Sequence, residues 1–496
     1  MSSEALLALT GLLFTIYSIM PTERRLDLRL RLRLFDWVLV ATSLGALHYI
    51  SYYPVLASIG VAPNLGPWRW RFTPDSASYL VVVGTAAVIW IRAGRAELSQ
   101  DKLAVFAKLL DQLVASGRSA DLVYLIDRHL ARLVELERTH RPAAGTSQTP
   151  SVAYEQLRDI FRRLLTTRSV VFEIAVYHPA LAVRLARVEV WDRWEYLSLL
   201  ARALLDRRHG PLYYEVEHNQ NLRSGHRYTI PGSNGYLSFF VGDAHRAHEL
   251  RIYKEFGDYA VGELRRLGRD PDGARYNAAL DEYETRERWA CPVHACIRVF
   301  DVMLPEAIHQ GVEWHMWLYY FPILADRVLE NLSPAPDVEL WREWPTPYHF
   351  LLYDVFGCLC NWLEESASMR DGRTNVAVRT LDLQHENESI AKSAALALGQ
   401  VLRSVLLADA VDPGFRSYLM GMALRTSKEV EHDGREDLAA VIRRSIAQGG
   451  PLPPRSDAYP ERLVEVFRDV DWLLRDKFRK DAHLGSVVEA ASSRGR

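Results

Sequence analysis

The chain of 496 residues contains only 4 cysteines and no excess of charge of either sign, with 60 lysine and arginine residues against 62 aspartate and glutamate residues. Four cysteines in so long a chain cannot make a disulfide scaffold. A formal net charge of −2 argues against a dedicated nucleic-acid-binding protein, because such a protein concentrates basic side chains on one face. We therefore expect no nucleic-acid partner.

The sequence also lacks the motifs of several common enzyme classes. Neither G-x-x-x-x-G-K-[ST] nor G-x-G-x-x-G occurs, which argues against a P-loop NTPase and a standard Rossmann enzyme, and no G-x-S-x-G elbow of an α/β-hydrolase is present. The cysteines, at positions 291, 296, 358 and 360, stand in C-x4-C and C-x-C spacings that match no usual structural zinc site. We expect buried thiols, no metal and no cofactor.

Three uncharged apolar runs lie near the amino end: Ala5 to Met20, Trp37 to Gly60 and Ala77 to Ile91. As a helix, the second run would cover about 36 Å, enough to span a bilayer with tilt, whereas the other two are shorter. The first run is interpreted as an uncleaved anchor, since Glu4 precedes it and no small-residue cleavage site follows. His48 lies within the second run, where an ionisable side chain is either functional or an interhelical contact.

The charges between the first two runs predict the topology. Five arginines lie there, namely Arg24, Arg25, Arg29, Arg31 and Arg33. Arginine-rich short loops stay in the cytoplasm, so three passes would leave about four hundred residues there, at the inner (plasma) membrane. Leucine alternates with charged residues from Leu26 to Leu34, which favours a strand with one apolar face. Next to a bilayer the same residues could lie on anionic lipid headgroups, and we prefer a membrane-surface or partner-pairing role.

Beyond the anchor, apolar residues recur at helical spacing, so the predicted fold is mainly α-helical, an irregular helical region with one minor β-hairpin. The hairpin is expected at Arg227 to Gly242, where β-branched and aromatic residues flank a glycine-rich turn. The predicted divisions are a membrane anchor (1–95), a juxtamembrane helical hairpin (96–141), a linker (142–151), an α-helical cytosolic domain (152–450), and a linker with an amphipathic C-terminal helix (451–496).

Two polar stretches are candidate sites. The first contains side chains that could act as general acid, act as general base or bind an anion, namely Glu215, Glu217, His218, Arg223 and His226. Its alternative interpretation is a capped helix end with a solvated loop. The second, from His309 to Phe321, mixes histidines with aromatics and is typical of core packing or of a ligand pocket. The Glu-x-x-His spacings at Glu215 and Glu306 would suit a di-iron site only within a fuller pattern, which the sequence lacks.

These features together favour a membrane-anchored helical interaction or sensing protein that acts through a membrane assembly. The expected partners are membrane lipids and either further copies of the chain or another protein. Two alternatives stay open. One is a triggered membrane effector that opens a pore or perturbs the bilayer, as in stress or phage defence, and the other is a membrane-tethered enzyme that uses Glu215 to His226. The preference for arginine over lysine suggests a bacterial source.

Overall fold

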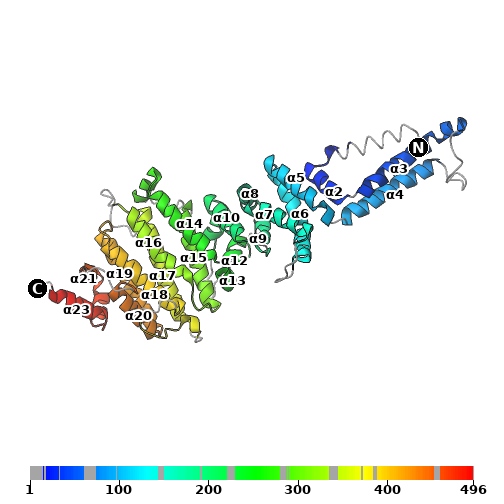
Figure 1. Ribbon diagram of the computed structural model, residues 1–496. Coiled ribbons are helices and arrows are strands. Elements are labelled where there is room, and N and C mark those ends of the chain that lie inside the picture. The colour runs from blue at the N-terminus through cyan, green and yellow to red at the C-terminus, as the bar shows by residue number, and fades with distance from the viewer. Residues whose placement is uncertain are drawn as a thin grey trace. The chain divides into compact units, whose positions relative to one another are not determined.

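Helices dominate the computed structural model (Figure 1), and the residues it describes contain no β-strand. The described residues are 15, 18–32, 34–60, 74–95, 98–142, 150–189, 193–219, 230–279, 288, 290–333, 345–369, 373–383, 388–451 and 458–494. The prediction of a mainly α-helical protein is confirmed. The chain divides into two units, the first comprising Met1–Ile174 with Val188–Arg193 and the second Ala175–Arg187 with Trp194–Arg496.

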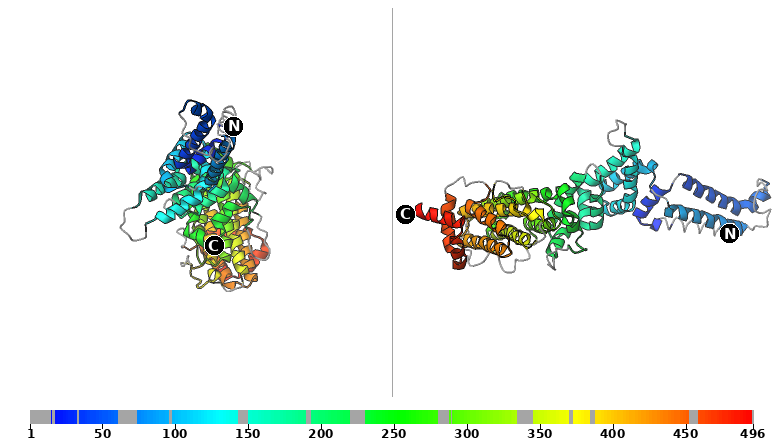
Figure 2. Two further views of the ribbon diagram at one scale, coloured as in Figure 1. Left: turned by 90° about the vertical axis from the view of Figure 1, so that its right-hand side faces the viewer. Right: turned by 90° about the horizontal axis from the view of Figure 1, so that it is seen from below.

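The first unit begins with an antiparallel pair of long helices, α3 (Leu34–Ser58) and α4 (Pro74–Arg95), which lie side by side in both figures of the ribbon (Figures 1 and 2). Arg92 donates to Asp36 at 2.8 Å. Thr85 donates to Ser43 at 2.8 Å, seven residues further along α3 and seven residues back along α4. Because both contacts obey the same spacing, they fix the register of the pair.

The outer surface of this pair is apolar. It exposes aromatic and aliphatic side chains on both helices, namely Phe35, Trp37, Val38, Tyr52, Val55, Ile59, Tyr79, Leu80, Val83, Val88, Trp90 and Ile91. A water-soluble helical pair would carry a polar outer face instead.

By length and composition, two helices in the described part of the chain could cross a membrane. One is α4, whose apolar window Asp75–Arg92 is mostly exposed, and the other is α18 (Ile390–Leu407), which is mostly buried and therefore a core helix. Helix α3, which contains most of the longest apolar run, is not among these two helices. The first run, Ala5 to Met20, falls almost wholly outside the described residues.

The leucine-arginine alternation does not make a strand. The segment forms α2 (Thr22–Arg31), so that prediction was wrong. Helical spacing brings Asp27 and Arg31 together at 2.9 Å, and Asp27 also binds His129 of α6 (Ser119–His140) at 2.9 Å. Leu30 is buried as well. Tertiary contacts with α6 thus favour the helix over the local period of two.

Two charged residues of α2, Asp27 and Arg31, are buried and paired inside the protein. Burial tends to raise the pKa of Asp27, but the hydrogen bond with His129 and the charge of Arg31 outweigh it, so the pKa of Asp27 is lowered. Arg24 is exposed and Arg25 half-buried, while the side chain of Arg29 and all of Arg33 lie outside the described residues. The buried Arg31 is an ion-pair partner of Asp27.

The remainder of the first unit packs α5 (Leu103–Ala115), α6 and α7 (Val152–Thr166) around an aliphatic and aromatic core. Each helix contributes residues at three- and four-residue spacing, including Phe106, Leu110, Leu125, Ile126, Leu133, Leu157, Ile160 and Phe161. Ser151 caps α7 by accepting the backbone N–H of Tyr154. A short 3₁₀ turn, η2 (Gln100–Lys102), precedes α5, and α8 (Arg168–Tyr177) runs from the first unit into the second.

The second unit is a succession of packed helices. In order they are α9 (Pro179–Ala186), α10 (Arg193–Asp206), α11 (Pro211–Glu217), α12 (Gly235–Val241), α13 (Ala244–Glu249), α14 (Ile252–Leu267), α15 (Pro292–His309), α16 (Tyr320–Asn331), α17 (Pro347–Ser368), α18, α19 (Pro413–His432), α20 (Glu436–Gln448), α21 (Ala458–Asp469), α22 (Trp472–Arg479) and α23 (Leu484–Arg494), with 3₁₀ turns η3 (Pro271–Asn277), η5 (Met316–Tyr319) and η6 (Thr374–Val376). Helix α18 packs against α16, α17 and α20, so it lies at the centre of this array (Figure 1).

The predicted β-hairpin is wrong over its described part. Residues 235–241 form α12, and residues 227–229 lie outside the described range. The aromatic residues that suggested a strand are buried core residues of the helix, with Tyr236 and Phe240 both fully covered. Tyr236 also donates its hydroxyl to the carbonyl oxygen of Ala175 at 2.6 Å, which anchors α12 to the end of α8.

Candidate functional site

Glu215, at the centre of the first candidate stretch, connects α11 to the start of α12. One carboxylate oxygen accepts the backbone N–H of Tyr236 at 3.1 Å, and the other accepts that of Leu237 at 2.8 Å. Asn234 donates its side-chain amide to the carbonyl oxygen of Glu215 at 3.1 Å. The first N–H groups of a helix have no partner within the helix, so Glu215 caps α12 from a distant part of the sequence.

The surroundings of Glu215 determine the pKa of its carboxyl group. Its side chain is buried, and burial raises its pKa, while the backbone N–H groups of Leu237 and Tyr236 lower it by a smaller amount. The net result is a pKa above the ordinary value. Because both oxygens already accept hydrogen bonds, Glu215 has a structural role that competes with any role as a general base.

Of the other candidate residues, the structure describes Glu217 and His218, and neither contacts the Glu215 carboxylate. Glu217 and His218 are exposed, and His218 donates from Nδ1 to the carbonyl oxygen of Tyr214 at 3.0 Å while stacking on the Tyr214 ring. Arg223 and His226 lie outside the described residues. Within the described residues, the arrangement is a capped helix end with two exposed polar side chains beside it.

Next to Glu215, the second unit has an open groove of about 890 Å³. Its walls come from α9, the turn between α10 and α11, and the beginning of α12. Basic side chains line it, namely Arg184, Arg187, Arg207 and His209, together with the apolar side chains of Val176, Pro179, Ala180 and Val183, and the ring of Tyr214. This volume lies within the usual range for small-molecule sites.

The backbone explains why these basic groups gather. Arg184 and Arg187 lie in the last turn and at the C-cap of α9, where the helix dipole favours cations. His209 has φ of 60°, a left-handed conformation that turns the chain sharply between α10 and α11. Sequence analysis missed this groove because its arginines come from two separate helix ends, and the only available signal was the enrichment of arginine at those ends.

All four cysteines are buried and unpaired in disulfides. Among the described residues, no group of three or more histidine, cysteine or acidic side chains is placed to hold a metal ion. Burial raises the pKa of the Cys360 thiol to about 12 and that of Cys296 well above its ordinary value. His294, between two of the cysteines, binds Asp354 at 2.7 Å.

In the second candidate stretch, His315, Trp317, Leu318 and Phe321 are buried, whereas Glu313, Met316 and Tyr319 are exposed. His315 is fully buried and accepts the backbone N–H of Trp317 at Nδ1 (3.1 Å), so it caps η5. Burial, with a contribution from nearby His248, lowers the pKa of His315 to about 2. The adjoining cavity holds about 40 Å³, too little for a small-molecule ligand. His309 binds Glu365 at 2.8 Å.

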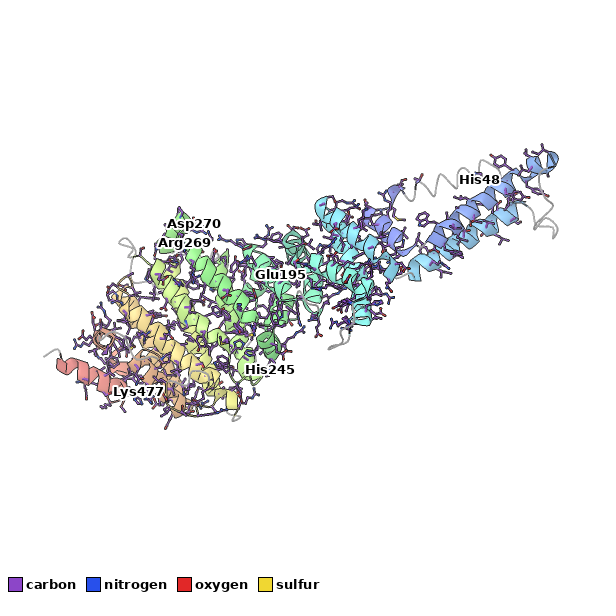
Figure 3. The ribbon with its side chains drawn as sticks, viewed as in Figure 1. His48, Glu195, His245, Arg269, Asp270 and Lys477 are labelled. Carbon is purple, nitrogen blue, oxygen red and sulfur yellow. The ribbon has the colours of Figure 1, made fainter. Side chains whose placement is uncertain are left out.

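His48 lies on the exposed surface of α3, where it is labelled in Figure 3. Its Nδ1 donates to the carbonyl oxygen of Leu44 at 2.9 Å, one turn earlier in the same helix. The imidazole is therefore not part of the described contact between α3 and α4, which is made by other residues.

Comparison of the chain with protein-family models, with curated proteins and with solved structures gives no significant match.

Proposed function

We propose that the protein is a membrane-anchored helical interaction or sensing protein, with its N-terminal helices in the inner membrane and its large C-terminal helical region in the cytoplasm. The observation that carries this proposal is the α3–α4 pair, which has polar contacts between its helices and apolar side chains on its outside. In water such a surface would drive aggregation, whereas in a bilayer it contacts hydrocarbon.

The aromatic residues of the pair add support. Trp37 is 46% exposed and Trp90 82% exposed, and both lie next to the Asp36–Arg92 ion pair at one end of the two helices. Tryptophan concentrates at membrane interfaces, where its ring is half in an apolar and half in a polar medium. This end of the pair would then lie at the cytoplasmic interface, in agreement with the arginine-based topology.

His48 supports an assembly within the membrane. An ionisable side chain exposed on a spanning helix is costly towards lipid, and such residues generally face other helices or a water-filled space. Packing of several α3–α4 pairs would cover His48 against a neighbouring copy. We therefore include homo-oligomerisation in the proposed function.

The membrane proposal is tested by fractionating cells that express the full chain. The wild type should sediment with membranes, resist extraction by alkaline carbonate and remain intact when protease is added to whole cells. A variant with Leu80→Asp and Val83→Asp should move to the soluble or aggregated fraction, because each carboxylate in the bilayer centre costs about 3 kcal/mol. The matched control changes two exposed valines outside the pair, Val105→Asp and Val152→Asp. Soluble wild-type protein, or equal behaviour of the two variants, would contradict the proposal.

A triggered membrane effector is the second candidate, and the exposed His48 is the observation that favours it. In an oligomer the same imidazole would line a water-filled pore. Leakage of a small dye from expressing cells tests this function. The effector reading requires that the wild type increase leakage and that His48→Leu reduce it; unchanged permeability in the wild type would eliminate it.

A further inference from the structure

We propose that the basic groove of the second unit is a binding site for a nucleoside diphosphate or triphosphate. The groove is defined by the residues named above on α9, the α10–α11 turn, α11 and the start of α12. The inference rests on the proposed function in one respect, since it names the ligand class that the sensing region would detect.

The positive charge of the groove indicates an anionic ligand. Three guanidinium groups, from Arg184, Arg187 and Arg207, line one concave surface and are exposed to solvent. Arg187 and Arg207 have no ion pair or side-chain hydrogen bond with any other residue that the structure describes. Arginine presents several N–H donors in a planar fork that matches phosphate oxygens. The guanidinium groups of Arg187 and Arg207, with that of Arg184 on the same concave surface, are suited to an anion with more than one phosphoryl group.

Among the described residues that line the groove, the one carboxylate, Glu215, does not cancel this charge. Both oxygens of Glu215 accept backbone N–H groups of α12, and the side chain is only 5% exposed. The partial positive charge of the helix start therefore offsets the carboxylate. The exposed part of the groove remains dominated by the arginines and by His209.

The stabilisation of helix ends accounts for some of this arrangement but not for all of it. Arg184 and Arg187 lie at the end of α9, where a cation is favourable. Arg207 and His209 follow the last residue of another helix, α10, and reach the same groove. Cations at two helix ends would interact with the helix dipoles equally well if each side chain pointed into open solvent. Their convergence on one concavity points to a shared anionic ligand.

The apolar wall and the aromatic side chain indicate what else the ligand carries. Pro179, Ala180 and Val183 form an apolar wall beside the arginines. Tyr214 is 61% exposed, lines the same groove, and stacks on His218 with ring centroids 4.1 Å apart. A planar base packs well on such an exposed ring. At about 890 Å³ the groove has room for a base, a sugar and a polyphosphate, far more than inorganic phosphate needs.

The experiment measures binding of ADP, pyrophosphate and adenosine to the full-length protein in lipid nanodiscs, by isothermal titration calorimetry without divalent cations. ADP should bind, adenosine should bind at least about 100-fold more weakly, and pyrophosphate about tenfold more weakly than ADP. Absence of ADP binding, or adenosine binding as tightly as ADP, overturns the proposal. So does equal affinity for pyrophosphate and ADP, because the base would then contribute nothing.

Variants assign the binding to this groove. Arg187→Gln and Arg207→Gln should each weaken ADP binding about tenfold, and Tyr214→Ala should weaken binding of ADP while leaving that of pyrophosphate unchanged. The matched control is Arg269→Gln, an exposed arginine just beyond the end of α14 (labelled in Figure 3) that is not among the residues lining the groove. Circular dichroism and thermal unfolding confirm that each variant folds. Unchanged affinity in the groove variants, or an equal loss in the control, contradicts the assignment.

Further results distinguish failure of the nucleotide proposal from failure of the membrane proposal. If vesicles of phosphatidylglycerol displace ADP from the groove, the site recognises lipid headgroups and the nucleotide proposal is wrong. If the protein fractionates with membranes as proposed but binds no ADP, only this inference fails. If it binds ADP through the groove yet is soluble in cells, the membrane function fails and the nucleotide site stands.

Discussion

Asp36 and Arg92 form an ion pair, with 2.8 Å between the carboxylate oxygen and the guanidinium nitrogen, across the first turn of α3 and the last turn of α4. The Asp36 side chain is only 4% exposed. A buried carboxylate needs a partner because burial removes its hydration. The pair thus closes one end of the apolar helical pair and couples two segments 56 positions apart in the sequence.

Arg92→Ala should destabilise this helical pair, because it leaves the Asp36 carboxylate buried without its guanidinium. The expected loss is about 1 to 3 kcal/mol in the free energy of unfolding. Unfolding of the detergent-solubilised protein by sodium dodecyl sulfate measures it. Asp36→Asn added to Arg92→Ala should recover part of the loss, and the exposed Arg128→Ala on α6 serves as control. Equal stability of the Arg92 and Arg128 variants would contradict this role.

Replacement of Glu215 should reveal its role as a cap for α12. Glu215→Ala removes both acceptors of the backbone N–H groups and should cost about 1 to 3 kcal/mol, whereas Glu215→Gln keeps one acceptor and should cost less. Denaturant unfolding followed by circular dichroism provides the comparison, with the exposed Glu217→Gln as the matched control. Equal losses for Glu215→Ala and Glu217→Gln would rule out the capping role.

The raised pKa of Glu215 predicts that the free energy of unfolding depends on pH. The pKa of Glu215 is raised by burial above the ordinary value of 4.5. As pH rises through this range, the unfolded chain releases the proton first, so the stabilisation that is complete below pH 4.5 is lost as pH passes the folded pKa. The stability of the wild type relative to Glu215→Gln should therefore fall from pH 4 to pH 7. A constant difference would show that the pKa of Glu215 is the same in the folded and unfolded chain.

His315 should make the second unit sensitive to acid. Burial lowers its pKa from 6.5 to about 2, so below pH 6.5 the unfolded chain binds a proton that the folded chain does not. This histidine alone should reduce the unfolding free energy by about 2 kcal/mol between pH 6.5 and pH 5. His315→Asn keeps an N-cap acceptor for η5 and should lack this acid-dependent part. Parallel pH profiles for the two proteins would contradict a neutral His315 in the folded state.

Two glycines of α14 should respond in opposite ways to alanine. A Cβ at Gly257 would overlap the ring of Tyr320 on α16, whereas a Cβ at Gly262 has nothing within 4 Å. Gly257→Ala should therefore destabilise the second unit by about 1 to 3 kcal/mol. Gly262→Ala should stabilise it by about 0.5 to 1 kcal/mol, because alanine favours the helix. Thermal unfolding of the two variants tests the close approach of α14 and α16, and an equal response at both positions would contradict it.

The helical character of the chain followed from its periodicity, since the amphipathic segments of α5, α6 and α7 bury the residues that their three- and four-residue spacing selects. Local patterns failed in two places, and a tertiary contact explains each failure. In α2 the alternation of leucine and arginine suggested a strand, but Asp27 needs Arg31 one helical turn away and His129 on another helix. At α12 the aromatic residues resembled a strand, but Glu215 caps them into a helix.

The candidate site was predicted only in part. Glu215 was identified as unusual from its polar neighbours, and it does lie at the edge of the groove. Arg184, Arg187 and Arg207 were not identified, because each belongs to an ordinary helix end that carries no motif. Residues from separate segments form a site only when the chain is folded, and a single sequence records no distance between them.

The sequence alone determined the helical class, the apolar segments near the amino end and the absence of common enzyme motifs, because these depend on composition and on periods of a few residues. The tertiary structure decided which polar groups are buried partners, which helix caps which, and where arginines from different helices meet. Those properties depend on contacts between residues far apart in the chain, such as Asp27 with His129 and Glu215 with Leu237, and the energy of each contact exists only after the intervening segments have packed.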